Sequence, residues 1–400
     1  MRVLFLSRWF PYPTDNGARI RVFNLLRQLA TVHSVDLVSF ASDPVTESSM
    51  AAMREICCKV EIFAYHPFRP NSIVSAAGFF AGKPRSVIDT YSKEMAAAVV
   101  RLHRQEHYDL VIASQFEMAP YALLLPDPIE RIWEEIELAV FYENYTRQHQ
   151  ILHRLRQGLT WRKMAHYTHD TLLNFHGCTT VTEKESELVA SLRPNDCSIE
   201  VIPNGVDVAG YRGDFGAPEP DTLVYAGALT YHANFDAMAY FIGEILPRIQ
   251  ARRPQAKLTI TGRTEGVALN RLPQNSAVSF SGYLEDVRPT VARSWISIVP
   301  LRIGGGSRLK ILESLALGTP VVSTAKGAEG LTLKPGVDLL IGDSAESFAD
   351  ATVRLLEDAS LRAKISHQGR ETVTAHYDWQ GIGQKLRAFV DAVHAQRRQP

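Results

Sequence analysis

Short apolar runs alternate with amphipathic stretches along the whole chain. Residues 3–7 form a first apolar run and a proline-rich turn follows; residues 20–29 then carry apolar side chains at helical spacing, before a second apolar run at 35–40. Compact apolar runs separated by a helical pattern predict buried parallel strands joined by helices. The chain therefore opens with a βαβ unit, and such units place ligand sites at the carboxyl ends of their strands.

The same alternation continues and predicts two α/β halves. Further strands of the first half are expected at 60–64, 110–113 and 178–182. Residues 201–221, rich in Gly, Pro and Asp, predict an interdomain linker. After the linker the pattern predicts strands at 222–226, 257–261, 278–281, 297–300 and 320–323 and helices near 234–252, 285–294, 307–317 and 346–357. We therefore predict domains at 1–205 and 206–375, followed by an amphipathic helix in 376–400.

Two neighbouring stretches carry opposite charge. Residues 129–143 contain Glu130, Glu134, Glu135, Glu137 and Glu143, whereas residues 147–169 contain Arg147, Arg154, Arg156, Arg162 and Lys163 and no acid. This pattern favours two solvated helix faces. The alternative is a basic surface that rests on anionic lipid headgroups beside the apolar segment 72–84.

Composition narrows the class of protein. The length of 400 residues favours two domains, and 46% hydrophobic with 22% charged residues is typical of a globular protein. Lys+Arg and Asp+Glu both number 43, so no nucleic-acid partner is expected. No apolar run approaches the roughly 20 residues of a membrane span, and the N-terminus lacks the pattern of a signal peptide. Four cysteines without zinc-like spacing fit a reducing compartment. We expect a cytoplasmic protein, free or attached to a membrane surface.

The stretch RIGGGSRLKILESLALGTPVVST, residues 302–324, contains the most informative chemistry. Arg308 and Lys310 fall in the first turn of a predicted helix, where the macrodipole is already positive and a cation costs about 0.3–1 kcal/mol. Three residues after Ser307, where a capping box has Glu or Gln, the chain has Lys310. These positions predict an anion at the start of this helix.

Six segments together resemble a known family. They are FLSRWFPYPTDNGARIRVFNLLRQLA, VTEKESELVA, VIPNGVD, VYAGALTYHANFDAMAYF, SFSGYLEDVRPTVARSWISIVP and RIGGGSRLKILESLALGTPVVST. In this order they resemble the GT-B glycosyltransferases of the large retaining family that uses nucleotide sugars (family four, glycosyl transferases group 1). The resemblance implies an α/β GT-B fold, with two Rossmann-like doubly wound domains facing a cleft and a C-terminal helix crossing back onto the N-terminal domain. It also implies a donor bound mainly by the C-terminal domain and an acceptor bound mainly by the N-terminal domain.

The resemblance also assigns roles to residues. It implies that backbone N–H groups of the glycine loop cradle the diphosphate and that Arg308 and Lys310 neutralise it and promote its departure. Glu313 would accept hydrogen bonds from the ribose, and Tyr283 and Leu284 would lie beside the nucleobase. The remaining donor-binding residues that it implies are Gly17, Gly227, Arg302, Gly304, Gly305, Gly306 and Ser307.

The chain departs from the family's pattern at several positions. The earlier of the family's two glutamates is replaced by Gly305, and an Arg and a Lys of the second domain are replaced by Ala228 and Ala233. These changes indicate a variant subgroup in which Arg308 and Lys310, with Arg302, supply the lost charge. Where relatives place a histidine near the reacting sugar, this chain has Ser114, Gln115 or Glu117, so no catalytic base is assigned.

The residues of the stretch 302–324, and the class of protein, have alternative explanations. Arg308 and Lys310 are alternatively solvated residues, and Glu313, among apolar neighbours, needs either a ligand or a structural hydrogen bond. No G-x-G-x-x-G, phosphate-loop or D-x-D motif is present, which argues against a dehydrogenase, an NTPase or a metal-dependent transferase. We predict a metal-independent, retaining glycosyltransferase of hexosyltransferase type, without a cofactor, that moves a sugar from a nucleotide diphosphate sugar to a glycan or lipid-linked acceptor in cell-surface or exported polysaccharide synthesis. The alternative is a non-catalytic sugar-nucleotide or glycan-binding protein on the same fold.

Overall fold

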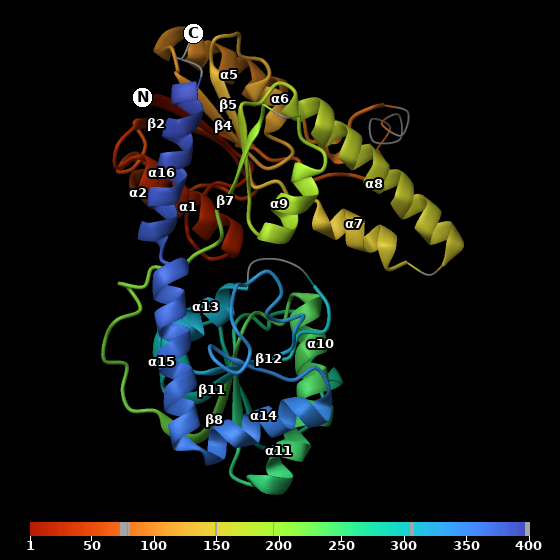
Figure 1. Ribbon diagram of the computed structural model, residues 1–400, viewed down its shortest axis with the longest axis vertical. Coiled ribbons are helices and arrows are strands. Elements are labelled where there is room, and N and C mark those ends of the chain that lie inside the picture. The colour runs from red at the N-terminus through yellow and green to blue at the C-terminus, as the bar shows by residue number, and fades with distance from the viewer. Residues whose placement is uncertain (73–77, 79–80, 149, 195, 305–307, 397–400) are drawn as a thin grey trace. The chain divides into compact units, whose positions relative to one another are not determined.

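The computed structural model describes residues 1–72, 78, 81–148, 150–194, 196–304 and 308–396. The chain divides into two compact units, which we call unit 1 (Met1–Pro203 with Ile382–Pro400) and unit 2 (Asn204–Gly381). Each unit contains one parallel sheet with helices packed against it (Figure 1). In the described part of the chain, no helix is both long and apolar enough to cross a bilayer.

Unit 1 is built on a seven-stranded parallel sheet in the order β3-β2-β1-β4-β5-β6-β7. The strands are β1 (Arg2–Ser7), β2 (Ser34–Ala41), β3 (Lys59–Ala64), β4 (Leu110–Ser114), β5 (Glu130–Glu134), β6 (Gly177–Thr180) and β7 (Ser198–Val201). The helices are α1 (Gly17–Leu29), α2 (Glu47–Arg54), α4 (Arg85–Asp89), α5 (Lys93–Glu106), α6 (Ala119–Ala122), α7 (Ala139–Thr146), α8 (Ile151–Leu172) and α9 (Glu183–Ala190). The strand order reverses between β1 and β4, so the crevice at their carboxyl ends is where this topology accommodates ligands.

Unit 2 has a six-stranded parallel sheet in the order β10-β9-β8-β11-β12-β13. Its strands are β8 (Glu219–Ala226), β9 (Lys257–Thr261), β10 (Val278–Gly282), β11 (Ser294–Val299), β12 (Val321–Ser323) and β13 (Leu340–Ile341). Its helices are α10 (His232–Tyr240), a π-helical turn (Phe241–Ile245), α11 (Leu246–Arg252), a 3-10 turn (Leu269–Arg271), α12 (Arg288–Ala292), α13 (Leu309–Ala316), α14 (Ala345–Glu357) and α15 (Ala359–His376). Here the order reverses between β8 and β11.

The helices and strands follow from local chemistry. Both faces of the central strands are apolar and fully buried, as at the successive residues Leu4 and Phe5 of β1, because helices cover both faces of a parallel sheet. The Asn16 side chain caps α1 by accepting a hydrogen bond from the Arg19 N–H at 3.1 Å. Ser344 caps α14 in a reciprocal capping box. The strand-then-capped-helix pattern of the sequence is therefore retained in both units.

The last helix, α16 (Trp379–Gln396), packs on unit 1 from residue 382 onward. The Arg387 guanidinium donates to the Gln28 side-chain oxygen at 2.7 Å and to the Gln28 carbonyl at 3.1 Å. Near the end of the helix, His394 Nδ1 lies 2.9 Å from Glu130 Oε2. These contacts join α16 to α1 and β5.

The prediction of a solvated helix face at 129–143 was wrong. Residues Glu130–Glu134 form strand β5, and the side chains of Glu130 and Glu134 are 7% and 1% exposed. Burial of these carboxylates is tolerated because each has a partner: His394 for Glu130 and Arg21 for Glu134. Both partners are distant in sequence, so the local charge pattern gave no indication that β5 is a buried strand.

The basic stretch at 147–169 does form a helix. Several helices of unit 2 differ in their bounds from the prediction. The helix α8 covers most of residues 147–169, and its first half is exposed. The helix predicted at 234–252 is divided by the π-helical turn, and the one predicted at 285–294 is shorter, Arg288–Ala292. The helix predicted at 307–317 begins at Leu309.

Candidate functional site

The candidate site of unit 2 lies where its strand order reverses. Strand β8 ends at Ala226 and leads through Gly227 to α10, and strand β11 ends at Val299 and leads to α13. Because β8 and β11 are neighbouring parallel strands, the segments that follow them emerge at the same edge of the sheet. The predicted residues Gly305, Gly306 and Ser307 lie outside the described residues.

The Lys310 ammonium is the centre of this edge. Its Nζ lies 2.8 Å from the Tyr225 hydroxyl oxygen and 3.1 Å from Asn234 Oδ1, and 4.1 Å from the centroid of the Tyr225 ring. The Tyr225 hydroxyl donates to Asn234 Oδ1 at 2.6 Å, and Asn234 Nδ2 donates to the Ala228 carbonyl at 2.8 Å. Side chains from β8, α10 and α13 therefore hold one cation in place.

Two glycines allow the backbone to approach this cluster. A Cβ on Gly227 would lie 2.7 Å from Lys310 Nζ, so no other residue fits there without displacing the lysine. Gly304 has φ of +95°, and a Cβ there would lie 2.9 Å from the Ala233 Cβ. The small side chain of Ala233, which is 1% exposed, therefore lies close to the Gly304 backbone.

Burial shifts the pKa values of the ionisable side chains at the start of α13. Burial, together with the nearby Arg308 cation and against the opposite effect of Glu313, lowers the pKa of Lys310 to about 7. Burial raises the pKa of Glu313, although the Tyr211 hydrogen bond and Lys310 favour its charged form. A lysine with this pKa responds strongly to any anion placed beside it.

Arg308 precedes the first residue of α13 and occupies its N-cap position. Its side chain is 6% exposed, Nη2 donates to the Gly304 carbonyl at 3.2 Å, and Glu329 Oε2 lies 3.9 Å away. The first turn of α13 contains no acidic residue. Both predicted cations thus lie at the helix start, with Arg308 buried at the cap and Lys310 in the first turn.

The other predicted donor-binding residues differ in their surroundings. Glu313 Oε1 accepts a hydrogen bond from the Tyr211 hydroxyl at 3.1 Å, so one of its two predicted alternatives, a structural hydrogen bond, is present. Arg302 pairs with Asp236 at 2.7 Å and stacks over Tyr240 at 4.3 Å, which balances its charge.

The remaining predicted donor-binding residues are those assigned to the nucleobase and the one in the loop after β1. Tyr283 is 57% exposed, and the Arg263 guanidinium lies 5.2 Å from its ring centroid. Leu284 is partly buried beside it in the sequence. Gly17 belongs to unit 1, where it is the first residue of α1.

Unit 1 contains a polar cluster that the sequence interpretation largely missed. The fully buried Arg21 donates through Nε to Glu134 Oε1 at 2.8 Å, and Ser114 Oγ donates to Glu134 Oε2 at 2.6 Å. Gln115 Nε2 donates to Glu135 Oε2 at 2.9 Å. Burial and the Glu134 charge raise the pKa of Glu135 to about 8.

This cluster lies at the carboxyl end of the unit 1 sheet. Trp9, just after β1, donates through Nε1 to Gln115 Oε1 at 3.1 Å, which bridges the two strands where the order reverses. Gln115 and Glu135 both have left-handed backbones, with φ of 75° and 58°. Two adjacent glutamates at the end of an apolar run were the available sequence signal.

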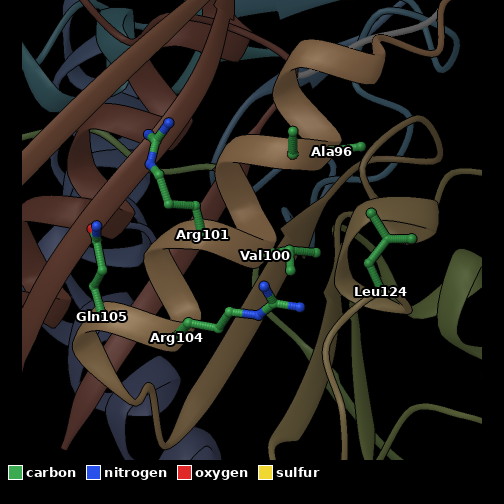
Figure 2. Close-up of a pocket in the computed structure, with 7 residues that line it drawn as sticks. Ala96, Val100, Arg101, Arg104, Gln105 and Leu124 are labelled. Atoms are coloured by element: carbon green, nitrogen blue, oxygen red, sulfur yellow. The ribbon is translucent and has the colours of Figure 1, made fainter.

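A separate pocket of about 650 Å³ lies against α5 (Figure 2). Its lining residues are Ala96, Ala97, Val100, Arg101, Arg104, Gln105 and Leu124. None of these belongs to the predicted site or to the Arg21 cluster. The chemistry of the candidate site therefore lies in the strand-end segments and not in this pocket.

Comparison with known proteins identifies the domain around Lys310. Residues 220–358 match the family model described as glycosyl transferases group 1. We refer to these matched residues, 220–358, as the group 1 domain. This group 1 domain contains α10, α13 and all the predicted site residues of unit 2.

Relatives of the group 1 domain include a lipid mannosyltransferase. The chain is 32% identical over 154 residues to the GDP-mannose-dependent monoacylated alpha-(1-6)-phosphatidylinositol monomannoside mannosyltransferase of Corynebacterium glutamicum, a match that covers 35% of this chain and 40% of the relative. The chain spans about half, between 40% and 55%, of the length of the curated relatives that it matches first.

Solved structures match the chain over nearly its whole length. The sucrose-phosphate synthase of Thermosynechococcus elongatus is similar with a TM-score of 0.69 and 18% identity, covering 99% of this chain and all of that one. HepE of Anabaena, solved with UDP and glucose, has a TM-score of 0.64 and 15% identity, covering 98% and 100%. These matches confirm the predicted fold class, an α/β GT-B protein with two Rossmann-like units that carry parallel sheets.

Proposed function

We propose that the protein is a glycosyltransferase that moves a sugar from a nucleotide diphosphate sugar to a hydroxyl of a glycan or lipid-linked acceptor. The supporting observation is the Lys310 ammonium, held by Tyr225 and Asn234 at the start of α13 within a group 1 domain. A helix start beside a glycine-rich segment is a favourable place for a phosphate. The diphosphate then lies against Lys310 and Arg308.

Lys310 is suited to bind this group. An ammonium has three N–H donors, and Tyr225 and Asn234 accept two of them among the described residues. The third is available for a phosphate oxygen. As the bond from the anomeric carbon to the β-phosphate oxygen breaks, negative charge grows on that oxygen, and a fixed cation there lowers the barrier.

The rest of the proposed donor site follows the sequence prediction. Arg308 adds a second charge from the N-cap, and Arg302 contributes once its pair with Asp236 is shared or opened. Glu313 binds the ribose hydroxyls while keeping the Tyr211 hydrogen bond. Tyr283 and Leu284 contact the base, and Gly17 is a further residue of the proposed donor site.

We further propose that the enzyme is retaining, of hexosyltransferase type, and independent of metal. The acceptor oxygen forms the new bond on the face from which the diphosphate leaves, and the acceptor proton passes to the departing phosphate. Arg308 and Lys310 supply the charge that a divalent cation supplies in other transferases. The variant subgroup, with Gly305 in place of a glutamate, is part of this proposal.

A second candidate function is a non-catalytic sugar-nucleotide or glycan-binding protein. The observation that favours it is the loss of family side chains at Gly305, Ala228 and Ala233. For the transferase, a lipid-linked glycan acceptor is supported by the mannosyltransferase relative, which by its name acts on a phosphatidylinositol monomannoside. We propose a cytoplasmic role in cell-surface or exported polysaccharide synthesis, with peripheral contact to the membrane that carries the acceptor.

The test is binding of UDP, GDP, ADP and TDP and their glucose and mannose conjugates, followed by release of nucleotide from any sugar nucleotide that binds. We expect one nucleotide class to bind the wild-type protein and Lys364→Met, an exposed-lysine control in α15, but not Lys310→Met. Nucleotide release by the wild-type protein supports the transferase. Binding without release or transfer supports the second candidate, and absence of all binding overturns both.

A further inference from the structure

The helix α8 is anchored at only one of its ends. Its buried side chains all lie in the C-terminal half, at Met164, Tyr167, Thr168, Thr171 and Leu172. Figure 1 shows α7 and α8 extending together from the sheet of unit 1. The N-terminal half, residues 151–160, therefore presents its side chains without burying any of them in the unit 1 core.

Four large apolar side chains are exposed on this half of the helix. Ile151, Leu152, Leu155 and Leu159 are 77%, 80%, 62% and 71% exposed. At 100° per residue, these four positions fall within an arc of about 100° on the helix. Single exposed apolar residues are ordinary, but a contiguous stripe of them marks a surface for interaction.

The partner helix α7 does not cover this stripe. Trp161 of α8 packs against Tyr142 with ring centroids 5.1 Å apart, and a Cβ on Gly158 would lie 2.9 Å from the Tyr145 ring. On the same helical projection, positions 158 and 161 fall about 20° to 80° beyond the edge of the stripe. The leucine face and the α7 contact are therefore separate sides of α8.

The charged side chains of the basic stretch are all positive, and one of them, Arg147, pairs with Glu143 of α7 at 3.2 Å. Residues 147–169 contain five cations and no acid. Arg154, Arg156 and Arg162 are exposed. Arg162 projects within the arc of the leucines and Arg156 about 40° beyond one edge, whereas Arg154 projects on the α7 side, with its guanidinium 5.8 Å from the Tyr145 ring centroid. Exposed leucines with flanking arginines are typical of a helix that lies in the plane of an anionic membrane surface.

Composition also weighs against a protein partner for this face. Binding hot spots in protein interfaces favour Trp, Tyr and Arg over Leu, and charged residues are depleted from interface centres. A stripe of Ile and Leu beside uncompensated arginines matches instead a bilayer, which offers acyl chains next to phosphate headgroups.

We propose that this face of α8, defined by Ile151, Leu152, Leu155 and Leu159 with Arg156 and Arg162, docks the protein on an anionic lipid bilayer. The leucine side chains enter the boundary between headgroups and acyl chains, and the guanidinium groups bind lipid phosphates. The inference rests on α8 alone and holds whether or not unit 2 transfers a sugar.

The test is sedimentation of the full-length protein with lipid vesicles. One set contains phosphatidylcholine alone and the other phosphatidylcholine mixed with phosphatidylglycerol. We expect binding to the mixed vesicles that weakens as salt is raised. Replacing Leu152, Leu155 and Leu159 by Gln should abolish it. Replacing Arg156 and Arg162 by Gln should lower binding about 25-fold, because each basic residue near such a surface contributes about 1 kcal/mol, or roughly fivefold.

The matched control is Val32→Gln, whose apolar side chain is 59% exposed just after α1, away from α8. It should bind vesicles as the wild-type protein does. Thermal unfolding of every variant checks the fold, which exposed positions should leave unchanged. Absence of wild-type binding to mixed vesicles overturns the proposal, as does equal binding by the leucine variant. A dimer that the leucine substitutions dissociate, without vesicle binding, would assign the face to a second copy instead.

Discussion

The pH dependence of nucleotide binding is the sharpest prediction for Lys310. In the free protein its pKa is about 7, so about half of the lysine is charged at pH 7 and about 3% at pH 8.5. A diphosphate beside Nζ favours the charged form and raises this pKa in the complex. Binding above pH 7 must therefore take up a proton.

The magnitude follows from these fractions. If only the charged form binds, the affinity for UDP or GDP falls about 15-fold between pH 7 and about pH 8.5, equivalent to about 1.6 kcal/mol. The diphosphate itself is already fully ionised in this range and adds little to the change. Lys310→Met should bind weakly and show no such slope.

Titration calorimetry measures the effect directly. At about pH 8, the observed enthalpy in buffers of different ionisation enthalpy should reveal uptake of about 0.9 proton per nucleotide by the wild-type protein and by Lys364→Met. A wild-type affinity that stays constant from pH 7 to about 8.5, with no proton uptake, would refute the assignment. So would an equal slope in Lys310→Met.

Three other predictions concern stability and the two clusters. Gly227→Ala places a Cβ 2.7 Å from Lys310 Nζ and should cost about 1–3 kcal/mol in urea unfolding together with a loss of nucleotide binding; unchanged binding would contradict the packing. Arg21→Met leaves the buried Glu134 without its cation and should cost about 3–5 kcal/mol in urea unfolding, whereas Arg354→Met, on the exposed surface of α14, should not. The pKa of Glu135, raised to about 8, means that the folded protein holds a proton that the unfolded chain releases near pH 4.5. This contribution to stability is therefore lost as the pH rises from about 4.5 through about 8, and Glu135→Gln should remove that decline in a pH series of urea midpoints.

Much of the fold was predictable because parallel strands are apolar on both faces. Strands such as β1 and β4 read as compact runs, and each is followed by a helical period that the structure retains. Strand β5 was not predictable in this way, because Glu130, Arg131 and Glu134 leave only Ile132 and Trp133 as apolar residues in it. The groups that make their burial tolerable, His394 and Arg21, are far away in sequence, and no local pattern reports such a pairing.

The candidate-site residues likewise separate into those that a local sequence rule predicts and those that it does not. Arg308 and Lys310 were found because they contradict the ordinary electrostatics of a helix start, which is a local rule. Tyr225 and Asn234, which hold Lys310, were missed because an aromatic residue at a strand end and an amide in a helix are unremarkable by themselves. Their role exists only once β8 and α10 are brought to α13.

The bonds from Tyr225 and Asn234 to Lys310 have a consequence for the entropy of binding. A free lysine side chain loses about 2 kcal/mol of rotamer entropy when it is immobilised. Here that loss occurs during folding, because two partners already fix the ammonium. A ligand that meets this lysine binds a preorganised cation, so its affinity is not reduced by ordering a flexible chain.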